Sequence, residues 1–268
     1  MTGRTGFIGS HLETRLLKDG HEVFGIDRKN WDGSTGDLIG IFNWFNPELV
    51  FHLGAKFVCE HTSEDIDDLV TSNVLFSTQV FEAMKEVGCT RLVMTGTCWQ
   101  NYDCREYRPV NLYAATKEAV ESILEYYIDA HGFKAVVLRL GDTYGPKDFR
   151  GKLFNVLNKA SEENPLKMSL GEQVLNLVHV NDVVEALLKS GKRTEYIKGK
   201  EVFFLSGSIV MVKDLVTVYE FVKGKKVPVI FGAKPYRKRE VFFPFIGETL
   251  PGWKAKIGLQ EGIKSLWS

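Results

Sequence analysis

The chain has 268 residues, in which 34 basic side chains balance 34 acidic ones. This balance leaves no excess positive field for nucleic acid, and no apolar run approaches the roughly 20 residues of a membrane span. The N-terminus also lacks the basic and apolar regions of a secretory signal. The sequence therefore predicts a soluble cytoplasmic protein that binds neither nucleic acid nor a membrane.

Short apolar, β-branched segments alternate with longer amphipathic ones along the first half of the chain. In chain order, the expected elements are a helix over 9–18, strands over 21–27 and 49–55, a helix over 64–87, a strand over 91–97, a helix over 112–131 and a strand over 135–140. Such alternation is typical of a parallel sheet that helices cover on both faces. The expected fold class is α/β.

The pattern changes after residue 143, where Gly-Pro and Asn-Pro turns and an aromatic, basic stretch at 231–253 follow. We expect a nucleotide-binding domain over 1–143, to which segments at about 176–190 and 200–206 return. The remaining segments, 144–175 and 207–268, would form a smaller α+β lobe that binds substrate.

The cysteines and histidines form no metal motif. The four cysteines contain no C-x-x-C pair, and the six histidines contain no H-E-x-x-H. The local cluster Cys59-Glu60-His61 lacks further ligands at metal-site spacing. We therefore predict reduced thiols and no metal site.

A glycine-rich turn, TGRTGFIG, occupies residues 2–9. Glycines three apart between a strand and a helix let the backbone approach a pyrophosphate, and the helix N-terminus offers free N–H groups to it. The next expected strand ends in Asp27, an acid that can bond both ribose hydroxyls of NAD and repel the phosphate of NADP. Arg28 could reduce the preference for NAD over NADP, so NADP stays possible. The alternative reading of Asp27 is a solvated acid at a strand end, without a role in binding.

Tyr113 and Lys117 are four residues apart at the start of an expected helix, so they share one face. A phenol acts as a base near pH 7 only if its pKa falls by roughly 3 units, and a nearby ammonium or a positive nicotinamide acts in that direction. Thr97 ends a strand at the sheet edge where ligands bind in α/β folds. An exposed helical pair and a strand-end threonine are the plainer alternatives.

Together with GDL at 36–38 and HLGA at 52–55, these motifs resemble those of the extended short-chain dehydrogenase/reductase family, the NAD-dependent epimerases and dehydratases of nucleotide sugars. The segments 138–146 and 171–182 extend the resemblance over nearly the whole chain. It implies a Rossmann-type doubly wound parallel sheet and hydride transfer at a sugar carbon. It also implies a homodimer in which helices 64–87 and 112–131 form a four-helix bundle.

The motifs and the resemblance together give three sets of site residues. The catalytic set is Thr97, Tyr113 and Lys117. The cofactor-binding set is Gly3, Gly6, Phe7, Ile8, Gly9, Asp27, Arg28, Asp37, Leu38, Leu53, Gly54, Ala55, Asn73, Thr95, Tyr113 and Lys117. The substrate-binding set is Thr97, Gln100, Asp142, Tyr144, Arg150 and Lys152.

Three departures from the family pattern bear on the reaction. Asp142 replaces a common asparagine, and its negative charge would repel a diphosphate. Leu175 replaces a common arginine that binds phosphate, so Arg150 or Lys152 would supply the missing positive charge. Cys98-Trp99 replace the Asp-Glu pair of the 4,6-dehydratases, which disfavours dehydration and leaves 4-keto reduction or epimerisation. The surrounding residues are similar to the CDP-abequose synthase-like reductases of surface-polysaccharide and deoxysugar synthesis.

Two further expectations concern activity and completeness of the sheet. A non-catalytic NAD(P)-binding regulatory or structural protein of the same fold is the alternative function, although such a protein has no need of a matched tyrosine, lysine and threonine. In a Rossmann domain the glycine turn follows a strand of about five apolar residues. Only Met1 and Thr2 precede Gly3, so we expect the first strand to be missing and its neighbours to lack their central partner.

Overall fold

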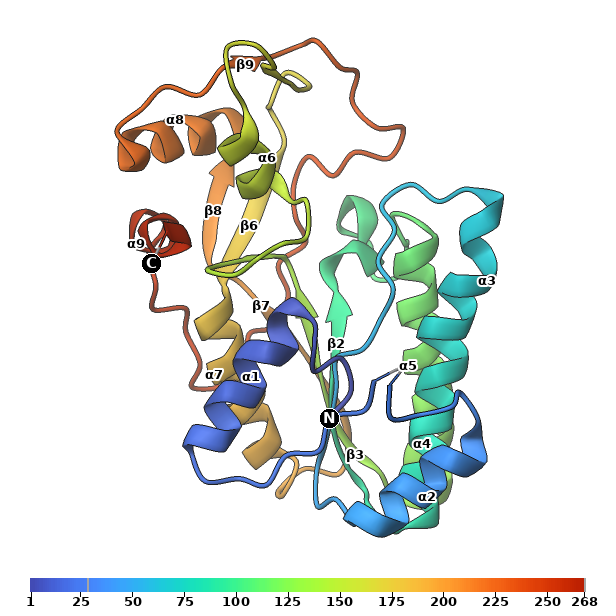
Figure 1. Ribbon diagram of the computed structural model, residues 1–268. Helices are drawn as coiled ribbons and strands as arrows, with labels where there is room; N and C mark the ends of the chain where they lie inside the picture. The colour runs from blue at the N-terminus through green and yellow to red at the C-terminus, as the bar shows by residue number, and fades with distance from the viewer. Residues whose placement is uncertain (28, 268) are drawn as a thin grey trace.

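The computed structural model describes residues 1–27 and 29–267. A larger body contains a parallel sheet between two layers of helices, and a smaller lobe lies beyond one end of this sheet (Figure 1). This arrangement confirms the predicted α/β class, with a doubly wound parallel sheet and a smaller α+β lobe. Within the described residues, no helix is long and apolar enough to cross a bilayer.

The main sheet has the strand order β1-β2-β3-β7, and all three pairings are parallel. Its strands are β1 (Val50–His52), β2 (Arg91–Thr97), β3 (Lys134–Leu140) and β7 (Gly199–Leu205). In β2 and β3 every residue after the first is buried, because helices cover both faces of the sheet. The four carboxyl ends therefore meet at one edge, which faces the smaller lobe (Figure 1).

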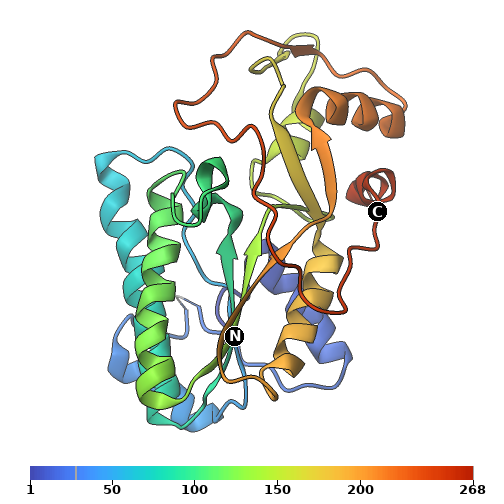
Figure 2. The same ribbon diagram turned by 180° about the vertical axis from the view of Figure 1, so that it is seen from behind.

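Helices α1 (Phe7–Lys18) and α7 (Val180–Arg193) cover one face of the main sheet (Figure 2). The other face carries α2 (Thr35–Phe45), α4 (Phe76–Glu86) and α5 (Leu112–His131). A 3-10 turn (Ser63–Asp65), α3 (Ile66–Leu69) and a π-helical turn (Val70–Leu75) lead without interruption into α4. The predicted helices over 64–87 and 112–131 are thus confirmed, whereas α2 was not predicted.

The smaller lobe contains a three-stranded sheet of order β4-β6-β8. Its strands are β4 (Asp142–Tyr144), β6 (Val174–His179) and β8 (Ser208–Met211), with β6 parallel to β4 and antiparallel to β8. Two short strands, β5 (Leu166–Lys167) and β9 (Val229–Ile230), pair separately. Helices α6 (Leu153–Lys159), α8 (Val212–Lys223) and α9 (Leu259–Lys264) pack around one apolar core of this lobe.

The boundary between the two parts differs from the prediction in two places. Residues 176–179 belong to β6 of the small sheet, where Leu177 pairs with Asp142, so the chain returns to the larger body only with α7. A second return was not predicted: the coil after β9 runs back along the larger body before α9 (Figures 1 and 2). There Trp253 is buried and its Nε1 donates a hydrogen bond to the Asp182 carbonyl oxygen (3.0 Å).

The segment 21–27 is not the regular strand that its apolar pattern predicts. Only Ile26 makes a bridge, a parallel one to Thr2, and Thr2 makes a second parallel bridge to His52 of β1. Thr2 thus lies between the two segments, as a strand residue would. In the described chain, residues 21–25 have no strand partner, which explains why they do not form a regular strand.

Candidate active site

The glycine turn lies at the carboxyl edge of the main sheet and is closely packed against the loop after β1. Gly3 has a φ of +70°, and a Cβ there would lie 2.7 Å from the Gly54 nitrogen. A Cβ at Gly9 would lie 2.0 Å from the Gly3 carbonyl oxygen. Helix α1 begins at Phe7, so its first N–H groups point out of this turn. The turn therefore has the shape that brings a phosphate to a helix N-terminus.

A buried hydrogen-bond chain holds the turn against β1 and α4. The Thr2 hydroxyl oxygen accepts the N–H groups of Leu53 (3.2 Å) and Gly54 (3.0 Å), which leaves its proton for His52 Nδ1 (2.8 Å). His52 Nε2 then donates to the Ser77 hydroxyl (2.8 Å). His52 is the central member of this chain, and sequence reasoning did not single it out.

Burial of His52, with Lys117 adding to the effect, lowers the pKa of its imidazole to about 3. An unfolded histidine has a pKa near 6.5, so between these values the unfolded chain binds one more proton. We therefore expect the free energy of unfolding to fall by about 1.4 kcal/mol per pH unit as pH decreases from 6.5. Urea unfolding between pH 7 and pH 5 measures this slope.

The matched variant for this measurement is His52→Gln, which retains one donor and one acceptor but does not titrate. Groups such as His179, whose pKa burial also lowers, are the same in both proteins and cancel in the difference. The pH slope of His52→Gln should be shallower than that of the parent chain by this amount. Equal slopes would show that His52 does not cause the acid sensitivity.

Asp27 lies next to the glycine turn, and an arginine of that turn pairs with it. The carboxylate accepts the Lys29 N–H (2.8 Å) and pairs with Arg4 (3.3 Å), and these contacts, Lys29 first, lower the pKa of Asp27. Arg28, the other predicted cofactor residue here, lies outside the described residues. The pairing of Arg4 with Asp27 was not predicted, although Arg4 lies within the glycine motif, because the motif gives functions only to its glycines.

The predicted adenine-pocket residues have separate structural roles. Asp37 lies in the first turn of α2 and accepts the Asp32 N–H (3.1 Å), which leaves its carboxylate half-buried at the surface. Leu38 is completely buried in the core beneath α2, so its side chain is not free to contact a ligand. Ala55, by contrast, is exposed at the end of the loop that contacts the glycine turn.

Tyr113 and Lys117 lie in the first turns of α5, as predicted. The helix begins there because Asn111 accepts the Ala114 N–H (3.0 Å) and donates to the Cys59 carbonyl oxygen (2.8 Å). The Tyr113 ring meets the Phe57 ring edge to face, with 5.0 Å between centroids. Lys117 is 4% exposed. One helical turn therefore presents a half-buried phenol and a buried ammonium side by side.

The pKa of the phenol differs from the expectation. Burial raises the pKa of Tyr113 above its usual value, the Cys98 thiol adds to this, and Arg150 opposes it. Burial likewise lowers the pKa of Lys117 to about 8, while Glu121 opposes the shift. The expected lowering of the Tyr113 pKa is therefore wrong for the polypeptide by itself, because desolvation outweighs the nearby positive charges.

Asn73 connects the helix that carries the pair to the loop after β1. It lies in the π-helical turn and is 1% exposed. Its amide accepts the Lys56 N–H (2.7 Å) and donates to the Thr116 hydroxyl (2.9 Å). Asn73 was predicted to bind cofactor. In the structure its side chain joins the loop after β1, at Lys56, to the start of α5, at Thr116.

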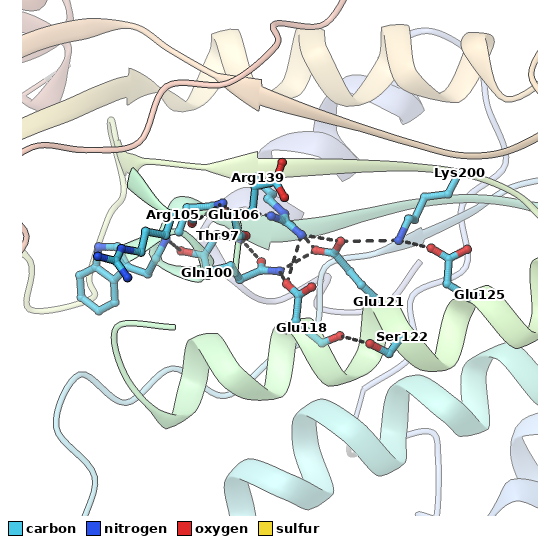
Figure 3. Close-up of polar contacts among 12 residues, drawn as sticks. Thr97, Gln100, Arg105, Glu106, Glu118, Glu121, Ser122, Glu125, Arg139 and Lys200 are labelled. Carbon is cyan, nitrogen blue, oxygen red and sulfur yellow. Dashed lines mark hydrogen bonds and ion pairs between the residues drawn. The ribbon is translucent and has the colours of Figure 1, made fainter. Parts of the chain in front are cut away.

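Thr97 ends β2, and its backbone is held by a buried glutamine. Its hydroxyl accepts the Trp99 N–H (3.2 Å) and keeps its own proton for another acceptor. Its N–H donates to Gln100 Oε1 (2.9 Å), and Gln100 is completely buried. Gln100 was predicted to contact substrate; the structure instead places it beneath Thr97, in the network that Figure 3 shows.

This network, which we call the Arg139 network, consists of Gln100, Glu118, Glu121, Arg139 and Lys200 (Figure 3). Gln100 Nε2 donates to both glutamates, at 2.6 Å and 2.7 Å, and Arg139 pairs with Glu121 (2.8 Å) and Glu118 (3.2 Å). A Cβ at Gly96 would lie 2.8 Å from Gln100 Oε1. The glycine between Thr95, which is also buried, and Thr97 therefore makes room for the network.

Two predicted phosphate-binding cations lie at the junction of the lobe and the larger body. The Arg150 guanidinium stacks over the Phe7 ring of the glycine turn at 4.2 Å and pairs with Asp148 (2.7 Å). Lys152 lies over the Phe57 ring at 4.6 Å and pairs with Asp142 at 3.8 Å. The predicted acid Asp142 thus has a cation beside it. Lys152 stands near Tyr113 through the Phe57 ring, which contacts both.

Tyr144 is the predicted substrate residue that the structure places elsewhere. It is 2% exposed and packs against Phe154 and His179 in the core of the lobe. Its hydroxyl lies so close to α9 that a Cβ at Gly262 would be 2.2 Å away. A substrate contact for Tyr144 is therefore wrong, because its ring is packed in the apolar core of the lobe.

Arg237 is a cation that sequence reasoning did not assign to the site. It donates to the Cys59 sulfur (2.7 Å), pairs with Glu240 (2.6 Å) and lies 5.5 Å from the centre of the Trp99 ring. Trp99 in turn contacts Phe57, whose ring meets Tyr113. The basic stretch at 231–253 therefore reaches the sheet edge at which Tyr113 lies. The spacing of residues along the sequence does not predict this contact.

A glycine turn at a helix N-terminus, with a tyrosine, a lysine and a threonine at the same sheet edge, defines a dinucleotide-binding oxidoreductase of the α/β class. The chain belongs to the NAD dependent epimerase/dehydratase family, whose sequence model matches residues 1–205. The predicted membership in the nucleotide-sugar branch of the extended short-chain dehydrogenases/reductases is thereby confirmed.

Curated relatives and solved structures agree with this placement. The chain is 27% identical to a CDP-abequose synthase of Yersinia pseudotuberculosis over 261 residues, which cover 91% of this chain and 90% of that protein. It is 30% identical to a UDP-glucose 4-epimerase of Mycolicibacterium smegmatis over 71% of this chain and 72% of that protein. The structure of MoeE5 in complex with UDP-glucose and NAD superposes with a TM-score of 0.87, at 25% identity over 98% of this chain and 95% of that one.

Proposed function

We propose that the protein is an NAD(P)-dependent oxidoreductase or epimerase that transfers hydride at a carbon of a nucleotide-activated sugar. The observation that supports this proposal is that Thr97 ends β2 at the sheet edge that holds the glycine turn, while Tyr113 and the buried Lys117 lie in the first turns of the adjacent α5. The enzymes among its relatives, which include a reductase of a dTDP-4-keto sugar from Escherichia coli, act on the same class of molecule. They give no support to a non-catalytic binding protein.

The residues present fit an NAD cofactor. The glycine turn leaves no room for side chains where a pyrophosphate would meet α1, and the ionised Asp27 lies beside it to receive ribose hydroxyls. When bound, NAD supplies or accepts the hydride. NADP binding is the weaker possibility, and Arg4, which pairs with Asp27, is the residue that would favour it.

The proposal gives the catalytic residues three functions: proton exchange, positioning of the sugar oxygen and binding of the cofactor. Tyr113 exchanges the proton of the sugar hydroxyl, and Thr97 donates its free hydroxyl proton to hold that oxygen in place. Lys117 would hold the ribose of the nicotinamide, and Arg150 opposes the effect of burial on the pKa of Tyr113. Arg150, Lys152 and Arg237 would hold the diphosphate at the junction with the lobe.

Dehydration is disfavoured by the chemistry of the two residues after Thr97. Burial, with Asp142 adding to it, raises the pKa of the Cys98 thiol to about 12, so Cys98 stays protonated at neutral pH. Trp99 offers only an N–H donor and does not exchange protons. Neither residue therefore replaces the acid-base pair that elimination of water requires, which leaves 4-keto reduction or epimerisation.

The test is a spectroscopic assay of the purified protein. With reduced cofactor, a 4-keto sugar nucleotide should cause loss of the reduced-nicotinamide absorbance if the protein is a reductase. With oxidised cofactor, a UDP- or CDP-hexose should give its 4-epimer by nuclear magnetic resonance if it is an epimerase. Failure of both reactions across UDP-, CDP-, GDP- and dTDP-sugars, with NAD bound, would contradict the proposal.

Asp27→Ala should weaken NAD binding by about 10- to 100-fold, because charge-assisted hydrogen bonding to the ribose, with a net value of about 1.5–3 kcal/mol, is lost. NADP binding should change far less or improve, because Arg4 then loses its Asp27 partner and keeps only the longer pairing with Glu13 (3.6 Å) among the described residues. Isothermal titration with both cofactors measures the change. The matched control is Asp19→Ala, an acid that pairs with Arg15 at the far end of α1. An equal loss of NAD and NADP affinity would contradict this role.

We propose, finally, that the protein forms a homodimer in the cytoplasm. Large apolar side chains are exposed on the helical segment 63–86 and on α5, among them Ile66, Val70, Leu75 and Tyr126. Their burial against a second copy would form a four-helix bundle. The four cysteines are free, which fits a reducing compartment.

A further inference from the structure

The coil after β9 contacts the backbone just before α5 through the side chain of Arg239. Its Nε donates a hydrogen bond to the Val110 carbonyl oxygen (2.9 Å), and its Nη2 donates to the Pro109 carbonyl oxygen (2.8 Å). These two residues directly precede Asn111, whose side chain caps α5. A side chain 129 positions beyond Val110 therefore holds the backbone from which this helix starts.

The contacts of Arg239 fix its guanidinium in one orientation. The planar group donates to two successive carbonyl oxygens and lies over the Tyr102 ring, 4.2 Å from its centre. The side chain is half-buried. Hydrogen bonds from a charged donor are stronger than those between neutral groups, so loss of these two bonds should loosen the backbone that they hold.

The backbone before α5 also binds two other loops. The Val110 N–H donates to the carbonyl oxygen of Trp99, in the turn that follows β2 (2.8 Å). The Asn111 side chain donates to the carbonyl oxygen of Cys59, in the loop after β1 (2.8 Å). Arg239 is therefore a third support of this backbone, and it is the one that the C-terminal part of the chain supplies.

Tyr113 lies in the part of α5 that depends most on these supports. The first N–H groups of a helix have no acceptor within the helix, and helix ends loosen before the centre does. Tyr113 is the second residue of α5, whereas Lys117 lies in the second turn and is buried. The position of the Tyr113 hydroxyl thus depends on where the residues before the helix are held.

We propose that Arg239 is a positioning residue for hydride transfer at the sugar. It holds the first turn of α5, so that the Tyr113 hydroxyl stays aligned with the sugar oxygen, and it does not touch the reacting atoms. Arg237, two residues earlier, is one of the cations assigned to the diphosphate, so one coil joins the diphosphate to the helix that carries the tyrosine. This inference rests on the proposed function.

The kinetic experiment compares Arg239→Met, Arg239→Lys and Lys238→Met in the full chain. In Arg239→Met, which cannot donate these bonds, kcat should fall by about 10- to 100-fold, because small displacements of a reacting group have effects of this size. KM for the cofactor should change by less than about threefold, since the Thr2 hydrogen bonds that hold the glycine turn do not involve Arg239. Arg239→Lys, which keeps the charge and a donor, should have an intermediate kcat. The control, Lys238→Met, changes an exposed neighbour and should keep the parent kcat.

Amide hydrogen exchange measures the effect on the helix without substrate or cofactor. The N–H groups of Ala114 and Ala115 both bind Asn111. Arg239→Met should speed their exchange by at least about 10-fold, because bonds from a charged donor no longer hold the start of the helix. Exchange at residues 120–128, in the second half of α5, should stay unchanged, which excludes general unfolding. Lys238→Met should change neither rate.

Two results would overturn the proposal. Unchanged exchange at Ala114 and Ala115 in Arg239→Met would show that the start of α5 does not depend on Arg239. Faster exchange together with the parent kcat would show that the contact is only structural. Because the exchange measurement uses neither a sugar nucleotide nor a cofactor, its failure is distinct from failure of the proposed enzymatic function.

Discussion

Tyr113→Phe is expected to lower turnover by about 100- to 10,000-fold, the usual contribution of a general acid-base group. The phenylalanine ring retains the edge-to-face contact with Phe57, so the shape of the site is preserved. Only the hydroxyl that exchanges the proton is lost. The affinity for NAD should therefore stay within about twofold of the parent value, because the effect is on a transition-state interaction.

The matched control for this variant is Tyr126→Phe, which removes the same hydroxyl from the same helix. Tyr126 lies more than three turns from Tyr113, and phenylalanine keeps the apolar ring that the proposed dimer would bury, so loss of the Tyr126 hydroxyl should not change turnover. Steady-state kinetics give kcat and KM, and isothermal titration with NAD gives the cofactor affinity. Near-normal turnover of Tyr113→Phe would show that another group exchanges the proton.

The long helices could be predicted because their ends carry local signals. Helix α5 begins after Asn111, whose side chain caps it, and ends at Gly132 in a left-handed conformation. Helix α2 was missed because two glycines and β-branched residues weaken its helical pattern. A signal was nevertheless present, since the Ser34 side chain accepts the Asp37 N–H and so starts the helix.

The site residues that could be predicted from sequence are those that lie close together along the chain. Tyr113 and Lys117 lie on one helical face, and the glycines lie in one turn, so spacing alone brings each group together. Gln100 and Tyr144 were misplaced because their environment depends on distant parts of the chain: Gln100 meets Glu121, and Tyr144 meets Gly262. The direction of the Tyr113 pKa shift was also missed, since burial is a property of the packed structure.

The Arg139 network leads to the second large effect. Arg139→Met should lower the free energy of unfolding by about 3–5 kcal/mol, the usual cost of breaking a buried ion pair from one side. Glu121 is 2% exposed and, among the described residues, would keep one ion pair, with Lys200 at 3.9 Å. The methionine retains the apolar stem, so the loss measures the charge. For a chain of this length, Tm should fall by about 10 °C.

The control is Arg193→Met, which removes a cation from an ion pair with Glu201. The Arg193 side chain is 34% exposed, against 11% for Arg139, so the cost should stay below about 1 kcal/mol. Urea unfolding of both variants measures the difference. Equal losses of the free energy of unfolding would show that the buried charge of Glu121 does not require Arg139 for compensation.

The same variant tests whether the network acts on catalysis through Thr97. Gln100 holds the Thr97 N–H and is itself held by Glu118 and Glu121, whose positions Arg139 fixes. With both carboxylates displaced, Gln100 loses its fixed orientation, and Thr97 no longer holds the sugar oxygen at one place. In fully folded Arg139→Met, kcat should therefore fall by a larger factor than the KM for the cofactor rises, because the Thr2 hydrogen bonds that hold the glycine turn do not involve this network. A normal kcat with reduced stability would restrict the network to a structural role.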